Sequence, residues 1–216
     1  DGRVDPHDRE ALQPLVALDR ARRGEATPEE VAAERALGDQ VAEDLADALE
    51  EATRQMGFCN FALTHHVDLV STRPGAVRIH NYPDEWVDHY DRHAMVFRDP
   101  VHRASHVTSV GFAWTRLPEM VALTAADQRM LDLGRKQGIG DGFTVPTHVP
   151  GEARGSVSFV VETGSPLPTE ALPLAQLVGN FAFEAARRLC FARGYRDTAR
   201  DPRLTDRQRD CVLWAA

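Results

Sequence analysis

The chain contains 216 residues, 43% of them hydrophobic, which is enough for one main domain of about 150 residues with its own core. It has no run near the roughly 18 consecutive apolar residues of a membrane span and no signal-peptide pattern, so we expect a cytoplasmic protein without a membrane partner. Its formal net charge is -8, and its three cysteines are scattered and odd in number, which favours reduced, buried thiols over a disulfide framework or a structural zinc site.

The first 57 residues are acidic and helical in pattern, with 15 acidic residues against 7 arginines. Residues 8–23 and 28–37 have the apolar spacing of helices, and they are interpreted either as a dimer contact or as a lightly packed arm. A longer amphipathic helix is expected over residues 39–56, and Gly57 is expected to end it.

The rest of the chain is predicted to alternate antiparallel strands with helices. Period-two patterns indicate strands, and apolar spacing of three to four residues indicates helices. The predicted strands are 58–63, 77–80, 142–148 and 155–162, and the predicted helices are 124–137 and about 169–193.

Aromatic side chains and one carboxylate gather in the middle of the chain. Tyr82, Trp86 and Tyr90 are spaced four residues apart, so a helix that starts just after Tyr82 places the two later rings on one face. Asp99 and Trp114 follow. Large aromatic residues that converge with one acid are typical of a mostly apolar small-molecule cavity with a single orienting hydrogen bond.

Each of these residues also has a purely structural interpretation. Trp86 and Trp114 belong to a residue type that often fills a core. Asp99 before Pro100 is typical of a helix N-cap, and Gly142 before a strand is typical of a backbone requirement. The joint spacing of the aromatic residues and the acid favours the pocket.

Histidines suggest a different class of function. Seven of the nine fall between residues 65 and 106, and His89/His93 and His102/His106 are four residues apart. Such pairs can hold a metal, which leaves a metallohydrolase as a remote alternative. Neither pair reads His-Glu-x-x-His, so we expect surface imidazoles, no metal site and no enzymatic activity.

Three motifs in a fixed order resemble the autoinducer-binding domain of the LuxR family of quorum-sensing transcription factors. They read Tyr-Pro-x-x-Trp-x-x-x-Tyr from Tyr82, Asp-Pro-Val from Asp99 and Phe-x-Trp from Phe112. The resemblance covers roughly residues 40–192, and residues 204–214 are similar to the first helix of the family's helix-turn-helix domain. Two independent signatures in family order make coincidence a poor explanation.

The resemblance implies an α/β (α+β) fold, an α-β-α sandwich with a central antiparallel sheet and helices on both faces. The chain would divide into an N-terminal helical extension (1–38), an autoinducer-binding domain (39–193), a linker (194–203) and a truncated start of the helix-turn-helix domain (204–216). Around this linker, residues 187–209 carry 8 arginines against three aspartates. These arginines either contact DNA phosphates or simply face water.

The ligand implied by the resemblance is an N-acyl homoserine lactone, with no cofactor. Its amide N–H needs a strong acceptor, which suits Asp99, and its lactone carbonyl needs a donor, which suits the indole of Trp86. Tyr82 or Ser158 would donate to the acyl carbonyl, and the other aromatic residues would form walls. The predicted ligand-binding residues are Tyr82, Trp86, Tyr90, Asp99, Val101, Trp114 and Ser158, and the predicted structural residues near them are Pro100, Phe112 and Gly142.

Three positions depart from the family pattern. Gln208 stands where the family usually carries glutamate, which removes one charge from the opening turn of the DNA-binding domain. Gly111 stands where the family usually carries proline, so a looser turn is expected there. Val87 is apolar where some relatives have arginine, which puts in doubt any contact that such an arginine makes to an oxidised acyl chain.

The partners implied by the resemblance are the autoinducer, a second copy of the chain and DNA. The chain ends inside the first helix of the helix-turn-helix domain, so the recognition helix is missing and no specific DNA binding by this chain is expected. No nucleophile–base pair accompanies the expected lactone site, which favours a receptor over an enzyme. An interaction module derived from such a receptor, or a solo regulator that responds to another small molecule, is the alternative. Acyl length, oxidation and aryl replacement stay open.

Overall fold

The computed structural model describes residues 28–66, 78–149 and 154–192. The predicted helix over residues 8–23, the linker and the start of the helix-turn-helix domain lie outside these residues. The helices are α2 (Pro28–Gln55), α3 (Asp84–Arg92), α4 (Pro100–Ser105), α5 (Leu117–Met120), α6 (Ala125–Lys136) and α7 (Leu172–Ala192). The strands are β1 (Asn60–His65), β2 (Arg78–His80), β3 (Phe112–Ala113), β4 (Ile139–Thr147) and β5 (Gly155–Glu162), and short 3-10 turns cover Met95–Phe97, Trp114–Arg116 and Thr169–Ala171.

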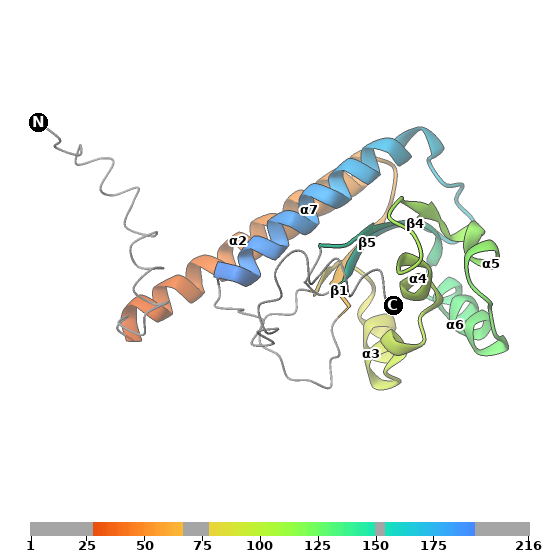
Figure 1. The fold of residues 1–216 in the computed structure, drawn as a ribbon, viewed down its shortest axis with the longest axis horizontal. Coiled ribbons are helices and arrows are strands. Elements are labelled where there is room, and N and C mark those ends of the chain that lie inside the picture. The colour runs from red at the N-terminus through yellow and green to blue at the C-terminus, as the bar shows by residue number, and fades with distance from the viewer. Residues whose placement is uncertain (1–27, 67–77, 150–153, 193–216) are drawn as a thin grey trace, which may run out of the picture.

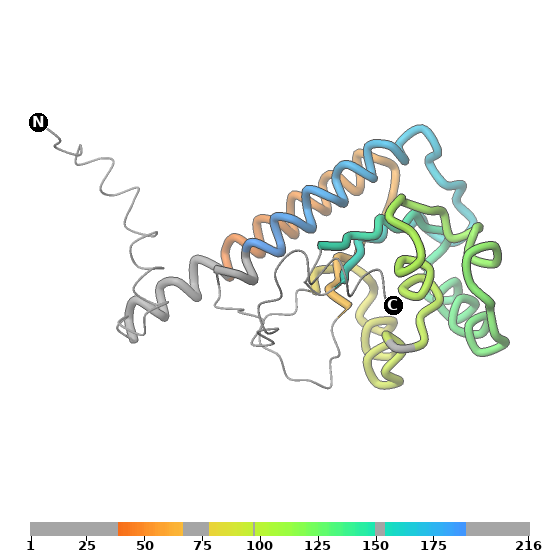
Figure 2. The backbone as a smooth tube through the Cα atoms, in the orientation of Figure 1, coloured from red at the N-terminus to blue at the C-terminus, as the bar shows by residue number. Residues whose placement is uncertain are grey.

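Within the described residues, five antiparallel strands form one sheet in the order β2-β1-β5-β4-β3. Helices α2 and α7 run side by side along one face of this sheet, while α3, α4, α5 and α6 lie on the opposite side (Figure 1). The backbone trace shows the same two helical layers (Figure 2). The predicted α-β-α sandwich with a central antiparallel sheet is therefore confirmed.

The main hydrophobic core fills the space between the sheet and the α2/α7 layer. Alternate residues of the strands point into it, since side chains on a strand alternate between faces. Small residues of α7, such as Ala175 and Ala182, let this helix approach the sheet closely. The strand residues of this core are Phe61, Leu63, Phe143, Val145, Val157, Phe159 and Val161. This face is closed, so any room for a ligand has to lie on the other one.

Helix α2 differs from the prediction of two separate helices. It runs without interruption from Pro28 to Gln55, so the predicted domain boundary after Gly38 falls inside a helix. A glycine in a helix interior costs about 1 kcal/mol relative to alanine, which a helix of 28 residues tolerates. Gly57 has a φ of 85° and follows the end of the helix, as the sequence indicates.

The turn before β3 differs from the loose turn expected at Gly111. The Gly111 N–H donates a hydrogen bond of 2.7 Å to Oε1 of Gln176 on α7. A Cβ atom at this position would stand 2.3 Å from Cζ of Phe143. The glycine therefore allows a close approach between the chain and the core, and the turn is tightly held.

Candidate ligand-binding site

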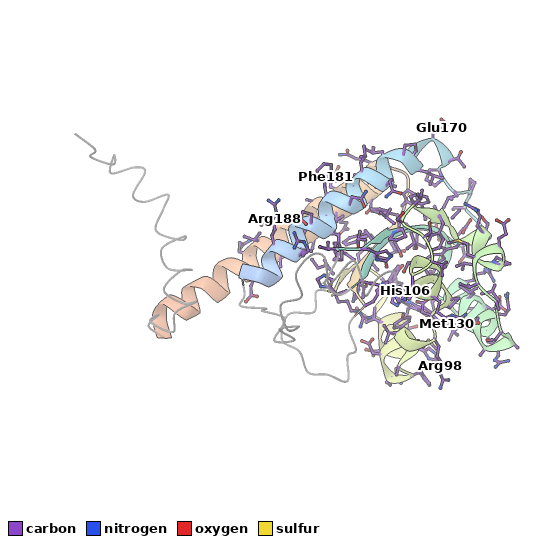
Figure 3. The ribbon with its side chains drawn as sticks, in the orientation of Figure 1. Arg98, His106, Met130, Glu170, Phe181 and Arg188 are labelled. Carbon is purple, nitrogen blue, oxygen red and sulfur yellow. The ribbon has the colours of Figure 1, made fainter. Side chains whose placement is uncertain are left out.

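A cavity of about 290 Å3 lies between the sheet and the helical layer formed by α3, α4, α5 and α6. This volume is near the lower end of the range for small-molecule sites. Met130 of α6 belongs to its wall, on the side of the molecule opposite α2 and α7 (Figure 3). All seven predicted ligand-binding residues line the cavity, namely Tyr82, Trp86, Tyr90, Asp99, Val101, Trp114 and Ser158. The structure brings them together, while their contacts with a ligand stay a prediction.

The three residues predicted to support the pocket lie behind this wall. Pro100 starts α4 and is fully buried, and Phe112 of β3 is buried as well. Gly142 lies inside β4 rather than before a strand, because β4 begins three residues earlier than predicted. A Cβ atom there would stand 2.7 Å from Cε2 of Trp114, so the indole rests on bare backbone.

Helix α3 presents two of the aromatic rings to the cavity. Trp86 and Tyr90 are one turn apart, and their ring centroids are 5.9 Å apart. Trp86 also packs close to Gly134 of α6, where a Cβ atom would lie 3.5 Å from Cη2 of the indole. The indole N–H of Trp86 has no hydrogen-bond partner among the described residues. It is therefore available as a donor to a bound molecule.

Asp99 combines the two interpretations that the sequence allowed. Its Oδ1 accepts a hydrogen bond of 2.8 Å from the N–H of Val101, as an N-cap of α4 does. Its Oδ2 accepts a hydrogen bond of 2.8 Å from the hydroxyl of Tyr90. The residue is 8% exposed and lines the cavity. Because a carboxylate offers about four acceptor sites, it can still take a further donor.

The two tyrosines nearest Asp99 are held as neutral phenols. Burial raises the pKa of Tyr82 far above its usual range, and the charge of Asp99 raises it further. Burial likewise raises the pKa of Tyr90, with added contributions from the charge of Asp99 and the hydrogen bond to it. Tyr90 is thus more than the apolar wall that the sequence predicts, since it also fixes the carboxylate.

A short chain of hydrogen bonds holds the opposite wall. The indole N–H of Trp114 donates to Oγ1 of Thr144 over 2.8 Å, and Thr144 and Ser158 share a hydrogen bond of 2.8 Å. Thr144 and Ser158 are register partners in the β4–β5 pair. Trp114 is therefore a wall with its donor already engaged, in contrast to Trp86. Thr144 was not predicted, although its position opposite Ser158 follows from the strand pattern.

Polar residues that were not predicted line the side of the cavity next to β2. Arg78 forms an ion pair of 2.6 Å with Asp91 and lies 5.8 Å from the ring centroid of Tyr90. The same side contains Thr64, His80, His102 and Ser156. Arg135 and Asp141 line another part of the cavity, near β4. Strand polar residues look like ordinary solvent-facing positions in a sequence, so no signal marked them as a group.

Histidines form a cluster at this side, and two of them correct the expectation of surface imidazoles. Nδ1 of His66 lies 2.8 Å from Nε2 of His106, and its Nε2 lies 2.9 Å from Oγ of Ser156. The ring of His66 also stacks on His102 with centroids 4.1 Å apart. Burial lowers the pKa of His66 far below its usual range. His65 is only 7% exposed, with its ring edge against Phe183.

A family model described as an autoinducer binding domain matches residues 42–186. The chain belongs to this family. Two transcriptional activator proteins, AhyR of Aeromonas hydrophila and AsaR of Aeromonas salmonicida, are each 27% identical over 175 residues, which cover 80% of this chain and 67% of each relative. The resemblance to LuxR-type quorum-sensing regulators is therefore confirmed.

Solved structures agree in fold. A crystal structure of Escherichia coli SdiA has a TM-score of 0.55 and 19% identity, and the match covers 85% of this chain and 77% of that one. SdiA in complex with octanoyl-rac-glycerol has a TM-score of 0.51 and 20% identity, with 85% and 75% covered. The family match begins at residue 42, inside α2, so it does not mark the predicted boundary after residue 38.

Other predicted features lie outside the cavity. No group of three histidine, cysteine, aspartate or glutamate side chains in the described part of the chain has a geometry that would hold a metal ion. The rings of His89, in the last turn of α3, and His93, just after this helix, are tilted to each other with centroids 4.2 Å apart. Cys59 is a free thiol and is exposed rather than buried. None of the described helices is long and apolar enough to cross a membrane.

Proposed function

We propose that this autoinducer-binding domain is the sensor of a quorum-sensing transcriptional regulator and that its cavity binds an N-acyl homoserine lactone. One observation carries the proposal. A free indole donor on Trp86 and a buried carboxylate acceptor on Asp99 line the same cavity. A lactone with a secondary amide needs one acceptor for its N–H and donors for its carbonyl oxygens.

Each polar group of such a ligand has a matching side chain. The amide N–H would donate to Asp99, a charge-assisted bond worth about 1.5–3 kcal/mol. The lactone carbonyl would accept from the indole of Trp86, and the acyl carbonyl would accept from the neutral phenol of Tyr82. Apolar residues of α5 and α6, among them Leu117 and Met130, would cover the remaining surface at about 0.8 kcal/mol per buried methylene.

We propose a receptor rather than an enzyme, although Ser156 of the cavity wall forms an unpredicted pair with a histidine behind it. Ser156 lies 2.9 Å from Nε2 of His66. His66 is a weak base because burial and the neighbouring imidazoles lower its pKa. Ser156 lies inside β5, where backbone N–H groups serve the sheet rather than an oxyanion. Ring opening of a bound lactone by this chain is therefore not expected.

The proposed ligand is tested most directly by removing one donor. Trp86→Phe keeps an aromatic ring in the wall but lacks the N–H, so lactone affinity should fall at least about tenfold, equivalent to roughly 1.4 kcal/mol. Isothermal titration with a panel of N-acyl homoserine lactones measures it, and Trp114→Phe is the matched control because its N–H already bonds to Thr144. Unchanged affinity in Trp86→Phe would contradict the proposed head-group contact.

We also propose a homodimer, joined through the outer surface of α7. Leu174, Leu177 and Phe181 are exposed along one stripe of this helix, and Phe181 is 74% exposed. Phe181 points away from the sheet (Figure 3). A two-fold dimer suits a regulator whose operator half-sites are related by symmetry, so the whole protein is proposed to act in the cytoplasm on DNA through a C-terminal helix-turn-helix domain.

The dimer surface can be tested with one charge. Phe181→Glu should raise the dimer dissociation constant at least tenfold, because it places a carboxylate in an apolar contact. Val107→Glu is the matched control, since Val107 is also an exposed apolar residue but lies beyond α4. Sedimentation equilibrium measures both, and equal dissociation constants for the two variants would exclude α7 as the interface.

A further inference from the structure

The register of β5 divides the cavity into two ends. Val160, Ser158 and Ser156 point toward the cavity side of the sheet, and four residues of strand span about 13 Å. Val160 packs with Trp86 and Ile139, whereas the hydroxyl of Ser156 forms a hydrogen bond with His66. The proposed lactone head lies near Trp86. The tail of that ligand must therefore run over Ser158 or turn toward α6.

The end beyond Ser158 is polar across three neighbouring strands, β5, β1 and β2. Ser156 is the register partner of Thr64, and Thr64 is the register partner of Arg78. His102 of α4 covers this row from the helical layer, and all four residues line the cavity. We call Thr64, Arg78, His102 and Ser156 the polar end. The apolar side chains Leu117, Met130 and Leu131 of the cavity come from α5 and α6, and α6 packs against β4.

Some hydrogen-bonding groups of the polar end are unpaired. Nδ1 of His102 is buried and has no hydrogen-bond partner among the described residues. The hydroxyl of Thr64 likewise bonds to none of the side chains or backbone groups described. The hydroxyl of Ser156 has a partner in His66 and retains acceptor capacity. If the acyl tail ended here in a methyl group, it would displace water from these polar groups and offer them no hydrogen bond in return.

The polar end is also close to neutral in charge. Arg78 is paired with Asp91 over 2.6 Å. Burial keeps His66 in its neutral form, because the pKa of this ring is lowered. The neutral ring of His66 and the hydroxyls of Thr64 and Ser156 suit a hydroxyl or carbonyl oxygen, whereas an acyl carboxylate would lack a free cation among these residues.

We infer that the natural ligand carries a neutral hydrogen-bonding oxygen, a hydroxyl or a carbonyl, at the distal part of its acyl group, where it contacts the polar end. This inference rests on the proposed function, because the lactone head fixes which part of the ligand reaches Thr64 and Ser156. The oxygen belongs either to an aliphatic chain or to an aromatic ring. Both forms offer the same chemistry to His102.

Two matched pairs of synthetic lactones test the inference by isothermal titration. One pair has a straight acyl chain with and without a terminal hydroxyl, and the other has an aryl acyl group with and without a ring hydroxyl. The hydroxylated member of at least one pair should bind at least tenfold more tightly than its partner. The pair with the larger ratio distinguishes chain from ring. If both unsubstituted lactones bind as tightly as their hydroxylated partners or more tightly, the inference is wrong but the proposed function stands. If no lactone binds, both the inference and the proposed function are wrong.

Two variants locate the effect. Thr64→Val removes a hydroxyl at nearly constant volume and breaks no hydrogen bond with the described residues, so the fold should persist. In this variant, and in Ser156→Ala, the preference for the hydroxylated ligand should fall below threefold. The unsubstituted ligand should bind to both variants at least as tightly as to the wild-type protein. Ser109→Ala, an exposed serine outside the cavity, is the control and should keep the full preference. An unchanged preference in both cavity variants would place the ligand oxygen elsewhere and overturn the inference.

Discussion

At the residue scale, Asp99 shows how one side chain can cap a helix and line a cavity. Its two oxygens serve different partners, Val101 on the backbone and Tyr90 across the gap between α3 and α4. The arrangement fixes the carboxylate before a ligand arrives. A group that is already oriented loses less conformational freedom on binding, which favours affinity.

Substitutions of Asp99 should separate these roles. Asparagine can still cap α4 and accept through its carbonyl oxygen but lacks the charge, whereas alanine leaves the ligand amide and Tyr90 unpaired. Lactone affinity should fall in the order wild type, Asp99→Asn, Asp99→Ala, by at least about tenfold for alanine. Titration of folded protein measures this, with the exposed Asp88→Asn as control. If folded Asp99→Ala protein bound the lactone with wild-type affinity, Asp99 would serve only as the N-cap of α4 and not as a ligand contact.

The aromatic half of the cavity could be predicted from sequence, but the polar end could not. Trp86 and Tyr90 share a helix, so their spacing alone places both rings on one face. His66 follows β1 and His106 follows α4, 40 residues later, and their 2.8 Å contact depends on how these two ends are placed in the fold. Long-range placement of that kind is set by packing, which the periodicity of a sequence does not contain.

At the element scale, one ion pair ties the helices of the cavity wall together. Arg103 of α4 donates to Oδ2 of Asp127 over 2.7 Å, and the same carboxylate forms a capping box with Thr124 at the start of α6. Burial would raise the pKa of Asp127, but hydrogen bonds from Thr124 and Arg103 lower it below its usual value. The predicted helix over residues 124–137 is confirmed as Ala125–Lys136, whereas the two-residue β3 and the one-turn α5 are too short for a periodic signal.

Loss of this link should cost stability. Asp127→Ala removes the half of the capping box that accepts from the N–H of Thr124 and leaves Arg103 without its partner, so the free energy of unfolding should fall by about 1.5–3 kcal/mol. Asp127→Asn should cost less, because its amide oxygen can still accept from the N–H of Thr124. Urea unfolding measures both, and Asp132→Ala, which removes an exposed pair with Arg135 on the same helix, should stay within about 0.5 kcal/mol. An Asp127→Ala protein as stable as Asp132→Ala would mean that α4 and α6 are held by apolar packing alone.

At the scale of the whole molecule, buried imidazoles link stability to pH. Burial lowers the pKa of His65, His66 and His80 in the folded state. As the pH falls below about 6.5, the unfolded chain takes up protons that the folded chain does not, so the folded state loses stability. The stability is complete above that pH. Carboxylates such as Glu184, whose hydrogen bonds with Arg187 and Arg188 lower its pKa to about 2, affect stability only at lower pH.

The window between pH 7 and pH 5 therefore isolates the histidines. The free energy of unfolding should decrease across it, by up to about 1.4 kcal/mol per pH unit for His66 below its unfolded pKa. His66→Gln should be less stable at pH 7 but should show a shallower decrease toward pH 5. Urea unfolding at both pH values measures the difference, with the exposed His93→Gln as control. Identical slopes in wild type and His66→Gln would rule out His66 as a source of the dependence.

The alternation of side chains along β5 has a consequence for how such receptors diverge. Val157, Phe159 and Val161 belong to the core beneath α2 and α7, whereas Ser156 and Ser158 line the cavity. Positions that hold the fold and positions that face the ligand are neighbours in the chain but lie on opposite faces of the sheet. Mutational drift can therefore retune the recognised molecule one substitution at a time, while the core that keeps the protein folded stays unchanged.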